Sequence, residues 1–131
     1  MCGGPSQSPL DLGNVTFADL GIFRFQGYGL LPTSVNVTNN GQTAHVTLKT
    51  KNPLKLSGGS LPGEYVFDQL HFHWGSSLDR GSEHTIEGTK FPMEMHMVHY
   101  NAKFKNVTEA TASGEQTAFA VLGFFFEVAV T

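Results

Sequence analysis

The segment YVFDQLHFHW (65–74) carries the strongest structural signal in the sequence. Polar and apolar side chains alternate along it, and side chains at alternate positions of a β-strand point to the same face of the sheet. The two faces of this strand are therefore Gln69, His71 and His73 on one side, and Leu70, Phe72 and Trp74 on the other. The pattern predicts a strand whose apolar face belongs to the core and whose polar face presents two histidines side by side.

The same period of two recurs along most of the chain, and clusters of glycine, proline and asparagine separate the segments. Further strand-like runs are SVNVTNN (34–40), HVTLK (45–49), PMEMHMVHY (92–100) and AFAVLGFFFEVAV (118–130). No long amphipathic helix and no internal repeat stand out. The sequence therefore predicts a mainly β structure, with residues 1–131 belonging to one domain.

The last run, 118–130, is apolar on both faces. A strand of this kind needs neighbours on both sides and cover above and below. Because the sequence ends at Thr131, directly after this strand, an exposed apolar edge would result. We therefore expect the chain to be part of a larger domain.

Composition excludes several classes of protein. The net charge of −3 gives no basic surface for nucleic acid. No apolar run is long enough to span a bilayer, and the start of the chain does not resemble a signal peptide. Cys2 is the only cysteine, so no disulfide can form within the chain. Three glycosylation acceptors favour a secreted parent protein, with an intracellular protein as the alternative; they are Asn14, Asn36 and Asn106.

The two histidines of 65–74 are spaced to bind one metal ion, because residues two apart on a strand share a face. A third ligand is expected from the neighbouring run 92–100. There Glu94, His96 and Val98 share one face, whereas Met95, Met97 and His99 share the other. Three neutral imidazoles, here His71, His73 and His96, suit Zn²⁺ with one coordination position left open. Gln69 and Glu94 lie on the faces of these ligands and are the expected acceptors of their second N–H groups.

Two other interpretations of the histidines are less consistent with the sequence. A cupin-type metal barrel shares the H-x-H pair but needs a carboxylate four or five residues later, where this chain has Ser77 and Leu78. His45 and His99 are interpreted as structural residues, because a single histidine in a strand is more often satisfied by hydrogen bonds than by a metal.

Several motifs together resemble the α-class carbonic anhydrases. They are QSPLDL (7–12), FDQLHFHWG (67–75), GSEHTIEG (81–88), EMHMVHYNAKF (94–104) and AFAVLGFFFEV (118–128). The resemblance runs along nearly the whole chain. It implies a large, twisted, mostly antiparallel sheet with few short helices, of which this chain holds the N-terminal half to two-thirds. It also implies a zinc lyase that hydrates carbon dioxide reversibly to bicarbonate by zinc-hydroxide attack.

The resemblance implies a role for each matching residue. His71, His73 and His96 would bind Zn²⁺, with Gln69 and Glu94 as hydrogen-bond acceptors behind His71 and His96. Val98 and Val121 would line an apolar pocket for carbon dioxide. Glu83 would be the carboxylate that orients a gatekeeping threonine, and His84 and Gln7 would be structural hydrogen-bonding positions.

The chain also departs from the family pattern. The threonine and the second cysteine would lie beyond Thr131, so Glu83 and Cys2 are expected to have no partner in this chain. Gln42 stands where fast members carry a proton-shuttling histidine, and an amide cannot relay protons near neutral pH. His45 is a possible substitute. The alternative hypothesis is therefore a short, catalytically silent product that binds zinc or a protein.

Overall fold

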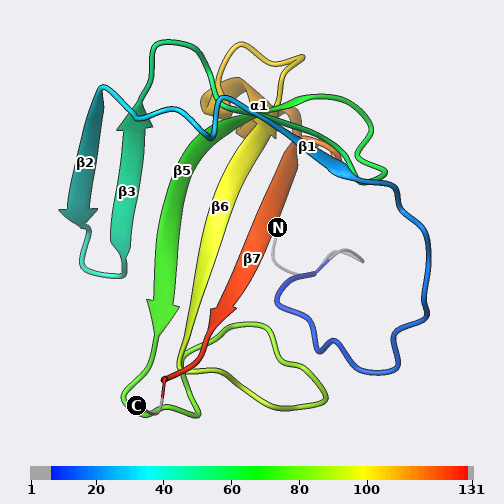
Figure 1. The fold of residues 1–131 in the computed structure, drawn as a ribbon, viewed down its shortest axis with the longest axis vertical. Helices are drawn as coiled ribbons and strands as arrows, with labels where there is room; N and C mark the ends of the chain where they lie inside the picture. The colour runs from blue at the N-terminus through cyan, green and yellow to red at the C-terminus, as the bar shows by residue number, and fades with distance from the viewer. Residues whose placement is uncertain (1–6, 130–131) are drawn as a thin grey trace. The chain divides into compact units, whose positions relative to one another are not determined.

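The computed structural model describes residues 7–129, so Cys2 and its expected lack of a partner lie outside the described residues. The described chain contains seven strands and one short helix (Figure 1). In chain order they are β1 (Phe23–Gln26), β2 (Ser34–Asn39), β3 (Ala44–Lys49), β4 (Lys55–Gly58), β5 (Tyr65–Trp74), β6 (Met93–Asn101), α1 (Val107–Ser113) and β7 (Phe119–Phe126). Within residues 7–129 no helix is long and apolar enough to cross a membrane.

The seven strands form one sheet. Strands β1, β4, β5, β3 and β2 follow one another in that order, and β6 pairs with both β5 and β7. The pairs β1–β4, β2–β3, β3–β5 and β4–β5 are antiparallel. The predicted mainly β, antiparallel fold with few short helices is therefore confirmed.

The chain divides into two compact units. Unit 1 comprises residues 7–18, 72–96 and 123–129, and unit 2 comprises residues 19–71 and 97–122. The boundaries fall inside β5, β6 and β7, so each of these strands contributes to both units.

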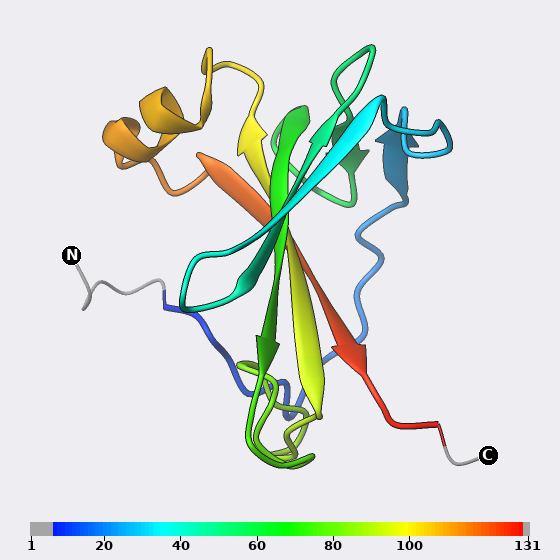
Figure 2. The same cartoon turned by 90° about the vertical axis from the view of Figure 1, so that its left-hand side faces the viewer.

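Unit 2 contains a small apolar core. Leu56, Tyr65 and Ala120 form its buried centre, and Leu61 and Leu122 pack against them. The hydroxyl of Tyr65 donates a hydrogen bond to the carbonyl of Thr117 at 3.0 Å, so its single polar atom is satisfied. Helix α1 lies in the connection between β6 and β7 (Figure 2) and buries Ala110 completely.

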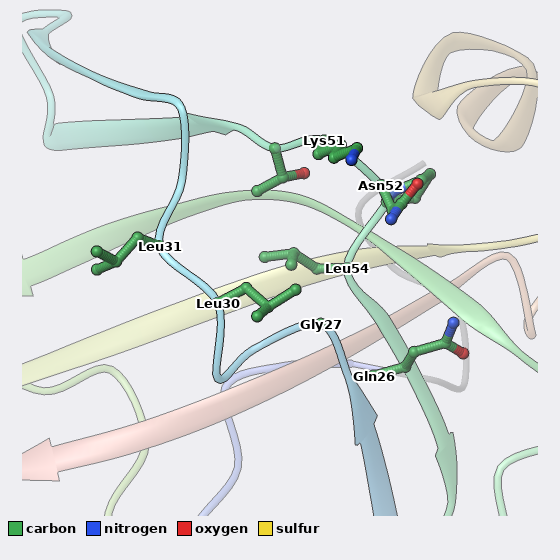
Figure 3. Close-up of a pocket in the computed structure, with 9 residues that line it drawn as sticks. Gln26, Gly27, Leu30, Leu31, Lys51, Asn52 and Leu54 are labelled. Carbon is green, nitrogen blue, oxygen red and sulfur yellow. The ribbon is translucent and has the colours of Figure 1, made fainter.

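Unit 2 also contains a shallow pocket of about 170 Å³ (Figure 3). Leu30 and Leu31, which follow β1, form one side of it, and the segment 50–54 before β4 forms another. None of the candidate site residues of the sequence lines this pocket.

Unit 1 is organised around the segment that connects β5 to β6. The backbone N–H groups of Gly81 and Ser82 both donate to the carbonyl of Phe91, at 3.0 and 2.8 Å. A Cβ atom on Gly81 would lie only 1.7 Å from the carbonyl oxygen of Pro92, so only glycine permits this close approach. The backbone of Thr85 forms hydrogen bonds with Leu10 and Leu12, on either side of Asp11. These bonds fix the other edge of the segment.

The apolar face of β5 is only partly covered in the described residues. Phe72 packs near Phe126, with ring centroids 6.5 Å apart, but Trp74 is 53% exposed. The prediction that Trp74 belongs to the core is therefore wrong, and Trp74 is the last residue of β5. On β7, Val121 and Phe124 are also exposed, as expected for an apolar strand that lacks cover.

Candidate metal centre

His73 on β5 and His96 on β6 lie together in unit 1. Their ring centroids are 4.6 Å apart, and His96 is buried. β5 continues without a break through His71, so His71 and His73 share one face of the strand. One ligand nitrogen from each of His71, His73 and His96 lies within 4.8 Å of the other two. The structure thus brings together the three histidines that the strand pattern selected.

Hydrogen bonds identify one nitrogen in each of two of these rings as a donor. Nδ1 of His71 lies 3.0 Å from Oε1 of Gln69, and Nε2 of His96 lies 2.7 Å from Oε1 of Glu94. A carboxylate or amide oxygen can only accept, so these two ring nitrogens carry the protons and donate. The lone pairs are then on Nε2 of His71 and Nδ1 of His96, which is the state that a metal ligand needs.

Burial favours a neutral imidazole at His73. Removal from water lowers the pKa of His73, and the attraction of Glu83 only partly opposes this effect. A lowered pKa keeps the imidazole neutral near pH 7. Three neutral imidazole donors with oriented partners fit Zn²⁺, which favours nitrogen ligands in tetrahedral sites.

Hydrogen bonds of Glu94 connect the segment between β5 and β6 to strand β6. Its Oε2 accepts the backbone N–H groups of Glu83 and His84, both at 2.9 Å, and its Oε1 accepts from His84 and His96. Burial raises the pKa of Glu94, but these hydrogen bonds outweigh it and hold the pKa below its usual value. Glu94 is therefore a buried carboxylate that stays charged and is satisfied by four donors.

Gly123 on β7 makes room for this carboxylate. A Cβ atom at Gly123 would lie 3.0 Å from Oε1 of Glu94, closer than side chains normally approach. The sequence pattern did not single out Gly123. A lone glycine inside an apolar strand could have indicated it, because such a position often marks the close approach of another group.

Glu83 contacts two of the histidines. Its Oε2 lies 3.4 Å from Nε2 of His73 and 3.8 Å from Nδ1 of His96. These contacts do not involve the threonine, so the expectation that Glu83 lacks its threonine partner in this chain stays a prediction. The backbone N–H of Glu83 donates to Glu94, which fixes this residue next to the histidine cluster.

His84 has the hydrogen bonds expected of a structural residue. Its Nδ1 lies 2.6 Å from Glu94, and its Nε2 lies 3.0 Å from the hydroxyl of Ser8. Nδ1 donates to the carboxylate, and a neutral ring would then accept the Ser8 hydroxyl proton at Nε2. Gln7, the neighbouring residue, is exposed.

His99 lies in a different environment from His96. It is completely buried, and its Nε2 lies 2.5 Å from the hydroxyl of Tyr28. Its Nδ1 faces the carbonyls of Met97 and Ala120 at 3.0 and 3.3 Å. The interpretation of His99 as a structural residue agrees with these contacts, and the Tyr28 partner was not foreseen.

Strand β3 pairs with β5 next to His71. His45 and His71 are directly opposite in the β3–β5 register, and opposite residues project to the same face of the sheet. Gln42 lies in the turn before β3, where its backbone N–H donates to Asn40. Val98 is half-buried on β6, and Val121 on β7 is 51% exposed.

Comparison with known proteins identifies the family. The family model for eukaryotic-type carbonic anhydrases matches residues 1–131. The chain is 45% identical over 95 residues to mouse carbonic anhydrase 7, covering 72% of this chain and 36% of that protein. It is 39% identical over an alignment of 132 residues to bovine carbonic anhydrase 6, covering 97% and 40%, respectively.

Human carbonic anhydrase 3 is 43% identical over 93 residues, covering 70% of this chain and 35% of that protein. The chain thus spans between 35% and 40% of the length of these relatives. The family match extends over the strands and the connecting segment that carry the histidine cluster. The chain belongs to the eukaryotic-type carbonic anhydrase family.

Proposed function

We propose that the protein hydrates carbon dioxide reversibly to bicarbonate and a proton, with Zn²⁺ held by His71, His73 and His96. Family membership supports the reaction, and the single observation that carries the metal site is the convergence of the three ligand nitrogens within 4.8 Å. Bound there, Zn²⁺ would supply a water molecule whose pKa is lowered to about 7.

Hydrogen bonds within the chain orient the rings of this site. Gln69 and Glu94 accept the outer N–H groups of His71 and His96, which fixes the tautomer and orientation of both rings. Glu94 also fixes the backbone of the connecting segment, and His84 helps to hold that carboxylate in place. Gln7 is proposed as a further structural position near His84.

Val98 and Val121 are proposed to form an apolar surface for carbon dioxide. Val98 shares the ligand face of β6 with Glu94 and His96, because the three positions are two residues apart. Carbon dioxide is nonpolar, so an apolar surface beside the site would hold it without competing hydrogen bonds.

We propose that Gln42 takes no part in proton transfer, because its amide cannot accept and release a proton near neutral pH. His45 is the proposed substitute. It lies directly opposite His71 in the sheet and projects to the same face. Glu83 is proposed to orient the gatekeeping threonine that the family resemblance implies.

The second candidate function is zinc binding without turnover. It is favoured by the contacts of Glu83 with His73 and His96, which engage this carboxylate within the histidine cluster. A chain in this state would hold the metal without using Glu83 to orient a threonine.

Metal analysis and stopped-flow carbon dioxide hydration test both candidates. The purified chain should bind one zinc ion, and His96→Ala should remove both the metal and any hydration activity. His45→Ala is the matched control, because it removes a histidine of the same face and should keep full zinc stoichiometry. Zinc binding without hydration would favour the second candidate, and equal zinc content in H96A and wild type would contradict both.

N-glycosylation is a further proposal that applies if the protein is secreted. Asn14, Asn36 and Asn106 are all exposed, so each acceptor is accessible to modification. A cytoplasmic location remains the alternative.

A further inference from the structure

We propose that Gly123 on β7 is a positioning residue of the candidate metal centre, because its missing side chain leaves the space in which Glu94 holds the ring of His96. The proposal rests on the metal site proposed above and adds to it a contribution from a third strand. It is carried by the contact that a side chain at position 123 would make with one carboxylate oxygen.

A side chain at position 123 would meet the carboxylate of Glu94 first. A Cβ atom there would lie 3.0 Å from Oε1 of Glu94, but 3.8 Å from Cδ2 and 3.9 Å from Nε2 of His96. The two distances to His96 are ordinary van der Waals contacts, whereas the distance to Oε1 is tighter than a Cβ atom normally tolerates. The φ angle of Gly123 is not positive, so the need for glycine comes from this contact and not from the backbone conformation.

Four hydrogen bonds hold the carboxylate of Glu94 in place. The residue is 1% exposed, and its Oε1 lies 2.6 Å from Nδ1 of His84 and 2.7 Å from Nε2 of His96. Its Oε2 accepts the backbone N–H groups of Glu83 and His84, both at 2.9 Å. To make room for a methyl group, the carboxylate would have to lengthen short, charge-assisted hydrogen bonds, one of which orients the ring of His96.

Strand β7 is also held in place beside this carboxylate. Phe125 lies two residues after Gly123, on the same face of β7, and stacks on Phe91 with ring centroids 4.4 Å apart. The carbonyl of Phe91 in turn accepts two backbone N–H groups of the connecting segment. Because both sides of the contact are fixed, we expect a methyl group at position 123 to disturb the hydrogen bonds of Glu94 instead of being accommodated by a shift of β7.

Gly123→Ala tests the proposal through two measurements that do not depend on activity. Competition with a chelator gives the zinc dissociation constant, and G123A should bind zinc about 10-fold more weakly, because losing the hydrogen-bond partner of a metal-ligating histidine weakens binding about 10–100-fold. Proton NMR of the metal-free chain observes the ring N–H groups of His84 and His96 that donate to Glu94. Their signals should shift in G123A, because the hydrogen bonds to the carboxylate change.

Gly13→Ala is the matched control in unit 1, because the nearest atom to a Cβ there would be Oδ2 of Asp11, at an ordinary 3.6 Å. Both measurements should match wild type in this variant. A double-mutant cycle with Glu94→Asp then tests the route of the effect. Aspartate draws the carboxylate back by one methylene group, so adding G123A to E94D should change both measurements less than adding it to wild type.

The proposal requires both changes in a folded G123A variant, so an unchanged zinc affinity or unshifted N–H signals would overturn it. Equal effects of G123A in wild type and in E94D would also overturn it, because the methyl group would then act by a route other than the carboxylate. If G123A alone does not fold, the double variant must fold for the proposal to stand. Failure of the wild-type chain to bind zinc would refute the metal site proposed above, and the N–H signals would still decide whether Gly123 positions Glu94.

Discussion

At the scale of single residues, strand parity separates two histidines that are only three positions apart. His96 shares its face of β6 with Glu94, and His99 lies on the opposite face, against Tyr28. The ring of His96 lies against that of His73, whereas both nitrogens of His99 are engaged in hydrogen bonds within unit 2. The alternation of β-strand side chains is therefore sufficient to assign one histidine to the candidate metal centre and the other to the fold.

The Tyr28–His99 pair predicts a specific alkaline loss of stability. Burial raises the pKa of Tyr28 to about 12. The folded state therefore keeps its proton above pH 10, where the unfolded chain releases it, so this contribution to stability is complete below about pH 10 and is lost as the pH rises toward 12. Tyr28→Phe should remove this loss, while the missing hydrogen bond costs about 0.5–1.5 kcal/mol at neutral pH. Urea unfolding at pH 8 and pH 11 measures both effects.

Tyr100→Phe is the control for that experiment, because it removes a half-buried tyrosine and leaves the Tyr28–His99 pair intact. It should retain the wild-type difference in stability between the two pH values. An equal alkaline loss in wild type and Y28F would show that Tyr28 does not titrate as its burial requires.

The residue-scale features that the sequence did not predict depend on long-range contacts. The hydrogen bonds of Gln69 to His71 and of Glu94 to His96 could be predicted from parity, because each pair lies on one strand. The contact of Glu83 with His73 depends on how the connecting segment folds. That fold is set by backbone hydrogen bonds to Phe91 and by the close approach of Gly81 to Pro92. No local sequence pattern predicts these contacts.

At the scale of elements, the strands with clear alternation were predicted well and the short ones were not. β5 has the predicted bounds, Tyr65–Trp74, and β6 differs by one residue at each end. β1 and β4, with four residues each, were not foreseen. Four residues show too little alternation to stand out, and these two strands are defined mainly by pairing with each other and with β5.

Helix α1 was also too short for its periodicity to be seen, and its ends explain why it forms. The side chain of Asn106 accepts from the N–H of Glu109 at 2.9 Å, and Gly114 ends the helix with a φ of 64°. Asn106→Ala should therefore lower the free energy of unfolding by about 1 kcal/mol, within a range of about 0.5–2. Chemical denaturation of the unglycosylated chain measures it.

Thr108→Ala is the matched control for the cap. It destroys the same glycosylation acceptor as N106A but keeps the capping side chain, and Thr108 is exposed. Its unfolding free energy should stay within about 0.5 kcal/mol of wild type, as for most surface substitutions. A loss in T108A as large as that in N106A would mean that the cap is not the cause.

At the scale of the whole molecule, the proposed metal would link positions that are distant in the sequence. His73 and His96 are separated by the whole connecting segment, and their rings meet only when β5 and β6 are formed. A site of this kind does not exist in the unfolded chain, so the free energy of metal binding adds to the free energy of folding. Zinc should therefore raise the stability of the chain, and a chelator should reverse the effect.

The size of this effect follows from mass action. Free zinc at 100 times its dissociation constant should raise the unfolding free energy by about 2.7 kcal/mol, less any binding to the unfolded chain. Urea unfolding with buffered zinc, and again with excess chelator, measures the difference. His73→Ala removes a central ligand and should abolish it, whereas His45→Ala leaves all three proposed ligands and should preserve it. A zinc-dependent gain of equal size in H73A would mean that the metal stabilises the fold from another place, because a site built on β5 and β6 cannot keep its affinity without the imidazole that lies against His96.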